Sequence, residues 1–515
     1  MKQKILFFLI LLCMTQGLLF NPTVGEIDKP SLKLNYVPHD PILIDGDVQL
    51  NQTVLNEGWS GSGTENDPYI IDDLYISETV LVDGVPISLT LKNINQHTVI
   101  RDNLLKSTTK YYGYGIHLFG CSNITIMNND IEFYAMALYV LNSDDVTIMR
   151  NTIFDNTRGC YTGDSEAVIF EENTFTNSSR YSFYIAQTEE VIFQSNTIKF
   201  SATDPSSPAW NALEQITSLI LFNNTFTEIY TYGLLLNIIS DAQIISNTFV
   251  ECANWDIAAY SVTSSNITRN QFIKTDATSY SGNIFFNDLS TTNIIYENNF
   301  EVVSPNGEHV LTHSIGNLFY NNGRGNYYSK YSGVDDNGDG IGDTSYTIQP
   351  DVIDDYPLIK PVDLLRPVLT SHDSELTFER DDDVVISWVA TDDNPTDYKV
   401  YEEHSLVKSD KWINGTNEAD LGNLSIGIHV FTIKLLDIDS NYASFNVTVF
   451  VQDTSDPTSP SNSTDPLGDL GALLSDNIVP IAAVSGVGIV SILTLRRAFG
   501  GKKKPKTRKP KKKKK

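Results

Sequence analysis

VTIMRNTI at residues 146–153 is the clearest copy of a phrase that returns along this chain, as VIFEENTF at 168–175, VIFQSNTI at 191–198 and LILFNNTF at 219–226. Each copy is a short apolar run followed by Asn, one further residue, and then Ile or Phe. Weaker copies extend the series, whose asparagines are Asn103, Asn129, Asn151, Asn173, Asn196, Asn224, Asn247, Asn270 and Asn298, with Asn322 expected as the tenth. The mean spacing is about 24 residues, and a fixed period of this length predicts a stacked solenoid.

Upstream of each apolar run, two apolar positions separated by one residue recur in the same place. Because alternate residues of a strand share one face, these columns are expected to point inward. They are Ile116/Leu118, Leu138/Val140, Cys160/Thr162, Phe183/Ile185, Leu234/Leu236 and Ile257/Ala259. The recurrent Asn lies at a corner, where it tolerates left-handed backbone angles and its amide can bond to the equivalent Asn one coil along. We therefore interpret these asparagines as structural.

This repeat resembles the right-handed parallel β-helix of the pectate-lyase-like superfamily, and more narrowly the NosD-like surface proteins of archaea. Two motifs carry the narrower resemblance: GWSGSGTENDPYIID at 58–72, and GNYYSKYSGVDDNGDGIGDTSYTI at 325–348 followed by DDYPLI. They are similar to the opening and closing signatures of that family. A leucine-rich repeat does not fit, because its Leu and helix spacing are absent.

The net charge of −28 is distributed very unevenly along the 515 residues. Residues 496–515 hold 13 of the 36 basic residues and the first four residues hold two more, which leaves 21 basic residues against all 64 acidic ones. The field of the long acidic part would repel phosphate, so nucleic acid is not expected as a partner. Cations are its natural partners.

The sequence predicts an all-β protein with several parts in series. We expect a signal peptide at 1–25, an N-terminal cap at 26–67, and a right-handed parallel β-helix with a closing element at 68–361. An immunoglobulin-like β-sandwich at 362–453 follows, because four alternating strand patterns are separated by Asp, Asn and Gly turns. A Ser-, Pro- and Asp-rich stalk at 454–477 leads to a transmembrane helix at 478–495 and a basic tail at 496–515.

These segments predict a single-pass type I membrane protein at the cell surface, since basic residues after a membrane helix favour the cytoplasmic side. An uncleaved N-terminal anchor is the alternative to a signal peptide. The basic tail either contacts anionic lipid or a cytoplasmic partner, or acts as a topology signal alone.

Nine N-x-S/T sequons suit a glycosylated exterior, and they begin at Asn51, Asn123, Asn177, Asn223, Asn266, Asn414, Asn423, Asn446 and Asn462. After removal of the signal peptide, Cys121, Cys160 and Cys252 remain. An odd number at uneven spacing predicts no disulfide framework. Stability is therefore expected from packing and from bound metal.

DDNGDGIGD at 335–343 is the sharpest local motif. Oxygen ligands at alternate positions with glycines between them suit calcium, which takes six to eight oxygens. The predicted ligands are Asp335, Asn337, Asp339, the backbone carbonyl near Ile341, and Asp343, the carbonyl being implied by the family's loops. In an EF-hand loop the twelfth position is a bidentate Glu, but here the twelfth residue counted from Asp335 is Tyr346. A missing ligand would therefore come from water or from Asp354 or Asp355. The alternative is an acidic turn without metal.

Between the inward columns lies an outward column of rings: His117, Tyr139, Tyr161 and Tyr184. One coil apart in a β-helix, they are expected to form an exposed aromatic strip that binds glycans. The alternative is that the rings only stabilise the stack through cross-strand packing. Tyr114, Tyr181, Tyr232 and Trp255 are expected to pack at a corner.

The sequence favours recognition or scaffolding, of glycans or the cell envelope, as the function. An alternative is a polysaccharide-acting lyase or hydrolase, for which the pairs Asp144–Asp145 and Glu189–Glu190 are the candidate carboxylates. A purely structural surface role is the third hypothesis. Copper is not expected, because Met, Cys and His are few and scattered.

Overall fold

The structure is a computed structural model that describes residues 36–453, apart from 78, 83, 202–209, 276–280, 303–306, 403–404 and 440. The chain divides after Leu364 into two compact units. The predicted signal peptide, stalk, membrane helix and basic tail lie outside the described residues, as does Asn462. Within the described part, no helix is long and apolar enough to span a bilayer.

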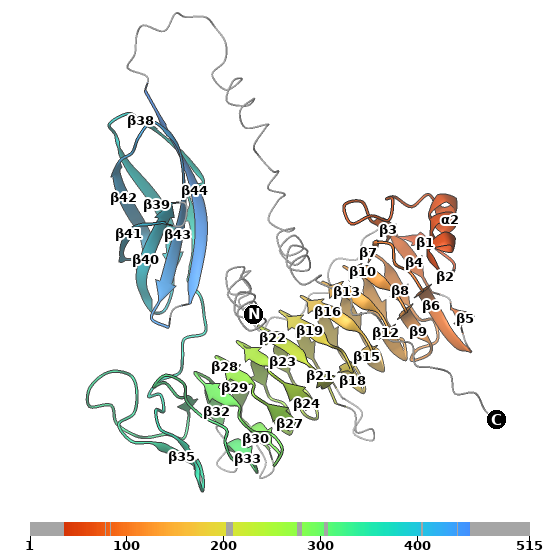
Figure 1. Ribbon diagram of the computed structural model, residues 1–515, viewed down its shortest axis with the longest axis horizontal. Coiled ribbons are helices and arrows are strands. Elements are labelled where there is room, and N and C mark those ends of the chain that lie inside the picture. Colours follow the sequence, from red (N-terminus) through yellow and green to blue (C-terminus); the bar gives the residue numbers. More distant parts are fainter. Residues whose placement is uncertain are drawn as a thin grey trace, which may run out of the picture. The chain divides into compact units, whose positions relative to one another are not determined.

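The first unit is a β-helix in which each coil adds one strand to each of three parallel sheets (Figure 1). Sheet 1 contains β2 (Ile42–Asp45), β6 (Val85–Lys92), β9 (Tyr114–Phe119), β12 (Met136–Leu141), β15 (Arg158–Gly163), β18 (Tyr181–Ala186), β21 (Ala212–Ile216), β24 (Leu234–Ser240), β27 (Trp255–Thr263), β30 (Gly282–Phe286) and β33 (Glu308–Thr312), with β5 (Val80–Val82) paired to β6. Sheet 2 contains β3 (Tyr69–Asp72), β7 (Thr98–Arg101), β10 (Ser122–Met127), β13 (Asp144–Met149), β16 (Glu166–Glu171), β19 (Glu190–Gln194), β22 (Ser218–Phe222), β25 (Gln243–Ile245), β28 (Asn266–Thr268) and β31 (Ile294–Tyr296). Sheet 3 contains β1 (Val37–Pro38), β4 (Leu74–Ile76), β8 (Leu104–Lys106), β11 (Asp130–Glu132), β14 (Thr152–Phe154), β17 (Thr174–Thr176), β20 (Thr197–Lys199), β23 (Thr225–Thr227), β26 (Thr248–Val250), β29 (Gln271–Lys274), β32 (Asn299–Val302) and β34 (Tyr327–Tyr328).

The predicted inward columns form the interior of this stack. All twelve of their side chains are fully buried. In sheet 3 the last residue of the repeated phrase also points inward, and from Phe226 to Tyr328 these rings stack coil upon coil. The centroids are 4.7 Å apart for Phe226 and Phe249, 5.2 Å for Phe249 and Phe272, and 5.1 Å for Phe272 and Phe300. A continuous column of rings therefore fills one side of the core.

The asparagines form a buried ladder between sheets 2 and 3. Asn129 shows the pattern: its Oδ1 accepts the backbone N–H and the side-chain Nδ2–H of Asn103, both at 3.0 Å. Its own Nδ2 donates to Ile100 O at 2.9 Å and to Asn151 Oδ1 at 3.0 Å. The predicted bonding from coil to coil is thus observed, and it satisfies amide groups that burial would otherwise leave unpaired.

Two details of the predicted ladder were wrong. The left-handed residue is the one before each ladder Asn, such as Asn128 with φ 54° and Arg150 with φ 53°, so the ladder Asn does not itself supply the left-handed angle. The tenth member is Asn326 and not Asn322, because Asn326 Oδ1 accepts the Asn298 N–H at 3.1 Å. Asn326 lies 28 residues after Asn298, as Asn298 does after Asn270, whereas Asn322 was placed at the mean spacing of about 24.

The ladder ends on a carboxylate. Asp354 is fully buried, and its Oδ2 accepts the backbone N–H of Asn326 at 2.8 Å while its Oδ1 accepts that of Tyr356 at 3.0 Å. Burial raises the pKa of Asp354 to about 6. A carboxylate accepts without donating, so it can end a chain of amide donors without leaving one unpaired.

At the other end, α2 (Asp47–Glu57) lies beside the first strands of the stack (Figure 1). Its Leu50 and Val54 are buried in the core. β1 and β2 precede this helix and already pair with β4 and β6, so parallel stacking begins within the segment expected to be the cap. At the C-terminal end, the hairpin β35 (Tyr346–Gln349) and β36 (Val352–Asp354) closes the stack, and the Tyr346 ring lies 4.4 Å from that of Tyr328.

The second unit is a β-sandwich with its own core around Trp388 and Trp412. One sheet contains β37 (Val368–His372), β39 (Asp383–Thr391) and β42 (Gly415–Asn423). The other contains β38 (Glu375–Glu379), β44 (Tyr442–Gln452), β43 (Gly427–Asp437), β40 (Pro395–Glu402) and β41 (Ser405–Lys411). Its strands pair antiparallel except β38 with β44.

Candidate binding surface

The predicted aromatic column is continuous on the outer face of sheet 1. His117, Tyr139, Tyr161 and Tyr184 are direct register partners in β9, β12, β15 and β18. Their ring centroids follow one another at 5.4, 5.4 and 5.6 Å, and the last two rings are nearly parallel at 6°. The structure therefore brings the four predicted residues together as one stack.

The exposure of this stack differs from the prediction. His117 is only 8% exposed, and the three tyrosines are half-buried. Because each ring lies against the next, the ring faces are largely occupied by one another. We infer that the half-buried tyrosines present ring edges and hydroxyl groups, of which that of Tyr184 is bound to Glu214.

Tyr114 and Tyr181, which were expected to pack at a corner, flank the stack directly. The Tyr114 ring lies 5.1 Å from that of Tyr139, and the Tyr181 ring lies 5.9 Å from that of Tyr184. The Arg158 guanidinium lies 5.9 Å from the centre of the Tyr181 ring. These side chains widen the strip across sheet 1 and place a cation at its margin.

A polar group that the sequence did not reveal ends the strip. The Tyr184 hydroxyl donates to Glu214 Oε2, and Asn237 Nδ2 donates to Glu214 Oε1 at 3.0 Å. Burial and the adjacent Glu214 carboxylate raise the pKa of Tyr184 to about 12. Tyr184 pairs with Ala212, 28 residues on, so the longer coil hides Glu214 from a count of the usual period. The signal that could have revealed Glu214 is its register column, in which Ala186, Glu214 and Asn237 lie opposite one another in successive coils.

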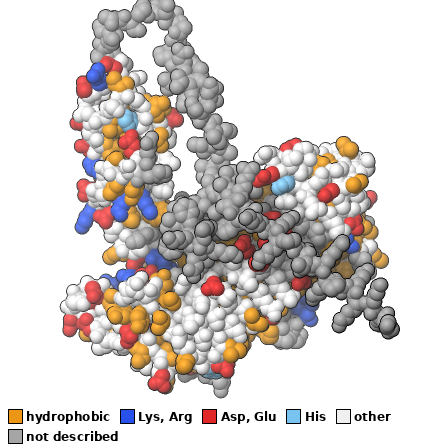
Figure 2. All heavy atoms as spheres, viewed as in Figure 1, with side chains coloured by type: hydrophobic (Ala, Val, Ile, Leu, Met, Phe, Trp, Pro, Cys, Tyr) orange, Lys and Arg blue, Asp and Glu red, His pale blue; other side chains and the backbone are white. Residues whose placement is uncertain are grey.

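The candidate catalytic carboxylates lie elsewhere, at the start of the sheet 2 strands. Asp144 Oδ1 accepts the backbone N–H of Glu166 at 3.0 Å. Burial raises the pKa of Glu166, with further contributions from Glu189, Asp144, Glu190 and Asp145. Like charges therefore gather along this edge. On the described surface seen in Figure 2, charged side chains are scattered over a mostly uncharged exterior, so charge alone marks no site there.

The DDNGDGIGD loop folds its side-chain oxygens onto its own backbone. The Asp335 carboxylate accepts the N–H groups of Gly338 at 2.7 Å and Gly340 at 2.8 Å, and Asp339 Oδ1 accepts that of Ile341 at 2.8 Å. Asn337 Nδ2 donates to Asp339 Oδ2 at 3.0 Å. The donor atoms are all oxygen, as a hard cation requires. No three carboxylates of this loop, all of which is described, have oxygens within 4.8 Å of one another.

The loop's additional ligand was expected from Asp354 or Asp355. Asp354 is unsuitable, because both of its oxygens accept backbone N–H groups at the end of the Asn ladder. Asp355 is exposed, and its Oδ1 accepts the hydroxyl of Ser345 in the loop at 3.1 Å. Asp343 Oδ2 accepts the Asp336 N–H at 2.8 Å. Both oxygens of Asp335 likewise accept backbone N–H groups, so a cation would have to replace these contacts, and its binding by Asp335, Asn337, Asp339, Ile341 and Asp343 stays a prediction.

The eight described sequon asparagines all reach the surface. Asn223, Asn414, Asn423 and Asn446 are exposed, and Asn51, Asn123, Asn177 and Asn266 are half-buried.

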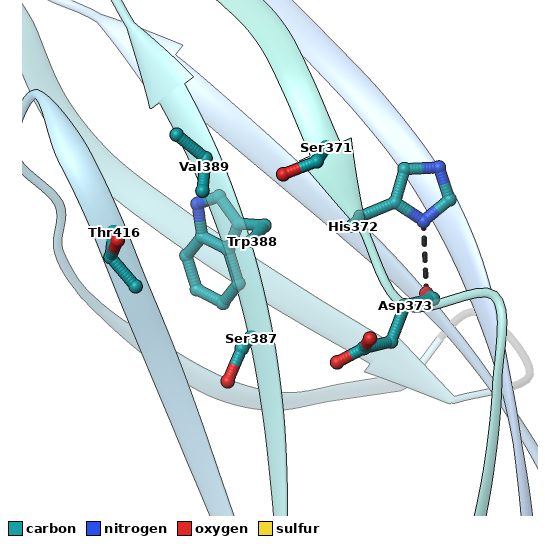
Figure 3. A pocket seen from close by; sticks show the side chains of 7 residues that line it. All are labelled: Ser371, His372, Asp373, Ser387, Trp388, Val389 and Thr416. Carbon is teal, nitrogen blue, oxygen red and sulfur yellow. Dashed lines mark hydrogen bonds between the residues drawn. The ribbon is translucent and has the colours of Figure 1, made fainter.

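In the second unit a depression of about 160 Å³ opens at the irregular pairing of β37 with β39 (Figure 3). It is lined by Ser371, His372, Asp373, Ser387, Trp388, Val389 and Thr416. Its volume is below the roughly 300–1,000 Å³ that is usual for small-molecule sites.

A family model described as "Right handed beta helix region" matches residues 89–204. No curated protein matches the chain. Among solved structures, DFA-IIIase from Arthrobacter chlorophenolicus A6 in complex with GF2 has 13% identity, covers 55% of this chain and 90% of its own, and gives a TM-score of 0.38. PfbA, a surface adhesin of Streptococcus pneumoniae, has 11% identity, covers 57% of this chain and 78% of its own, and gives 0.33. A structure of Clostridium thermocellum CbhA fibronectin(III)-like modules has 19% identity, covers 17% of this chain and 98% of its own, and gives a TM-score of 0.14. The family model and the parallel sheets together show a right-handed β-helix.

Proposed function

We propose that this chain is a membrane-anchored surface protein of the NosD-like type, whose β-helix presents sheet 1 to a glycan of the cell envelope. The immunoglobulin-like sandwich would act as a spacer between the β-helix and the membrane. The observation that carries the proposal is the strip formed by the hydroxyl edges of Tyr139, Tyr161 and Tyr184 and closed by Glu214.

This strip has the composition of a carbohydrate-binding surface. Ring edges give apolar contact area, and hydroxyl, carboxylate and amide groups exchange hydrogen bonds with sugar hydroxyls. Neighbouring coils are about 4.8 Å apart, so a polysaccharide lying along the β-helix axis would meet the same groups repeatedly. The long acidic part of the chain favours a neutral glycan over an acidic one, since like charges repel.

A glycan array probed with the full chain tests this proposal, with analysis of the glycans for cleavage products. Tyr139→Phe combined with Tyr161→Phe is the key variant, because it keeps the ring stack and removes two hydroxyls. We expect retained folding and at least a tenfold loss of glycan retention, since each hydrogen bond to a sugar is worth about 1 kcal/mol. Tyr230→Phe, at an exposed tyrosine away from the strip, is the matched control. Retention unchanged in the double variant would refute the proposal.

Two other functions give different outcomes in this experiment. A lyase or hydrolase would release products, and neutralising Asp144, Asp145 or Glu189 would stop the release. A purely structural surface protein would neither retain nor cut any glycan. Calcium bound to the 335–343 loop is compatible with all three functions. We propose that this ion is a structural staple held by Asp335, Asn337, Asp339, Ile341 and Asp343, with Asp355 or water completing its coordination shell.

A further inference from the structure

A group of polar side chains is enclosed inside the β-helix near its C-terminal end. Asp256 and Asn283 are fully buried and Lys274 is 1% exposed. Asp256 lies in β27 and Asn283 directly opposite it in β30, while Lys274 ends β29. A buried charged pair gains little stability from its own attraction, because both ions lose their hydration. The recognition strip uses none of these groups, so their presence requires another reason.

The contacts align an amine with a carboxyl group. Lys274 Nζ lies 3.4 Å from Asp256 Oδ1 and donates to Cys252 O at 2.6 Å. Asn283 Nδ2 donates to the other oxygen, Asp256 Oδ2, at 2.7 Å. Among the described residues, Asp256 Oδ1 accepts no hydrogen bond. One carboxyl oxygen is therefore polarised by an amide donor, while the other lies beside the amine.

The surroundings favour neutral groups over ions. Burial raises the pKa of Asp256 to about 6. Burial also raises the pKa of the neighbouring Cys252 thiol, which keeps it protonated. A buried site also lowers the free-energy cost of the neutral pair, an amine beside a carboxylic acid, relative to the two ions. Because the two groups are already held together, their reaction avoids the entropic cost of bringing two separate reactants into contact.

We propose that Lys274 and Asp256 form an intramolecular amide bond that closes this coil on itself. Nζ of the neutral lysine adds to Cγ of the protonated Asp256, and the Cγ–Oδ1 bond breaks. Oδ1 leaves as water, carrying the acid proton and one proton from Nζ. The step needs no oxidant or cofactor, and the donor Asn283 Nδ2 stabilises the charge that develops on Oδ2.

The amide product is neutral, so no charge from this pair stays buried in the interior. Its carbonyl oxygen is the former Oδ2, which keeps the hydrogen bond from Asn283. Its single N–H faces the Cys252 carbonyl, which already accepts from Nζ. The bond joins the start of β27 to the end of β29 and encloses residues 256–274 in a covalent ring. Such a ring restricts the unfolded chain much as a disulfide does, in a region that has no disulfide among its described cysteines.

Trypsin digestion of the unfolded full chain, followed by mass spectrometry, tests this bond. Basic residues at 199, 269, 274 and 324 set the cleavage sites. An unlinked chain releases residues 270–274 as a free peptide. A linked chain yields residues 200–269 joined to 270–324, with a mass lower by one water and no cleavage after Lys274. The segment 270–324 contains no sequon, so the free peptides 270–274 and 275–324 are read directly, whereas the linked product is read after removal of glycans from Asn223 and Asn266.

Variants separate the bond from an ordinary ion pair. Lys274→Arg keeps the charge but cannot form the amide, so cleavage after position 274 should return in full. Asn283→Ala should lower the linked fraction, because it removes the donor to Oδ2. Lys330→Arg, at an exposed lysine, should leave the link intact. Free peptide 270–274 in equal amount to the tryptic peptide 325–330 from the wild-type chain would overturn the proposal. Loss of ammonia within 270–324 would overturn it too, because it would place the bond on Asn283.

Discussion

Replacing one ladder asparagine should destabilise the β-helix far more than replacing the asparagine beside it. In Asn129→Ala, the backbone N–H of Asn103 loses its acceptor at 3.0 Å and stays buried, which costs about 1–3 kcal/mol. The bonds from Asn129 Nδ2 to Ile100 O and to Asn151 Oδ1 are also lost, at about 1 kcal/mol each. The expected loss of unfolding free energy is therefore about 3–5 kcal/mol.

Asn128→Ala is the matched control, because it removes the same side chain one residue away. Asn128 is exposed with φ 54°, and its side chain makes one long bond of 3.4 Å to Asp102. Alanine in this left-handed conformation should cost about 1 kcal/mol. Neither residue lies in a sequon.

The assay combines urea unfolding of the full chain with hydrogen exchange. Besides the larger fall in stability, the Asn103 amide should exchange at least tenfold faster in Asn129→Ala than in Asn128→Ala. Equal losses of stability in the two variants, with unchanged protection of the Asn103 amide, would refute the reasoning that the ladder satisfies buried amides.

Three further predictions follow from the core, the ladder end and the acidic loop. Phe249→Ala, which opens the ring column between Phe226 and Phe272, should cost about 3–5 kcal/mol in urea unfolding, against less than about 0.5 kcal/mol for the exposed Tyr230→Ala. Because the pKa of Asp354 is raised to about 6 in the folded state, its contribution to stability is full below about pH 4 and is lost as pH rises through 6. The stability difference between wild type and Asp354→Asn should therefore shift by up to about 3 kcal/mol between pH 4 and 7, and a constant difference would contradict this. Calcium should raise the melting temperature of the wild-type chain and chelator should reverse the rise, whereas Asp339→Ala should abolish the response and the exposed Asp336→Asn should keep it.

The sequence predicted the stack well because two simple periods determine it. Alternation fixed inward residues such as Ile116 and Leu118, and the recurring Asn fixed the corner between sheets 2 and 3. Asn326 was missed because the apolar run at 318–320 leads directly to Asn321 and Asn322, whereas Asn326 lies four residues beyond Asn322. Glu214 was missed because the coil that contains it is longer than its neighbours.

The buried polar group could not be predicted from alternation. Near the start of each sheet 1 strand, two adjacent residues face the core, as Ala137 and Leu138 do. Asp256 and Asn283 occupy the first of these positions, where strict alternation predicts an outward side chain. Gly159 occupies it in another coil, where an added Cβ would lie 2.2 Å from Ser182 O. Which side chain fits there depends on the bend between the sheets, which a single sequence does not show.

The Asn ladder also has a direction. In each bond between two ladder asparagines, the Nδ2 group donates toward the C-terminal end and the Oδ1 atom accepts from the N-terminal side, so each coil offers its successor the same donor that it accepts from its predecessor. A coil copied between Asn103 and Asn326 would meet identical partners above and below, and the gene could lengthen or shorten the protein by whole repeats. Beyond Asp354 no such addition is possible, because a carboxylate has nothing to donate onward. The length of the molecule is thus open to duplication inside and fixed at one end by a single acidic residue.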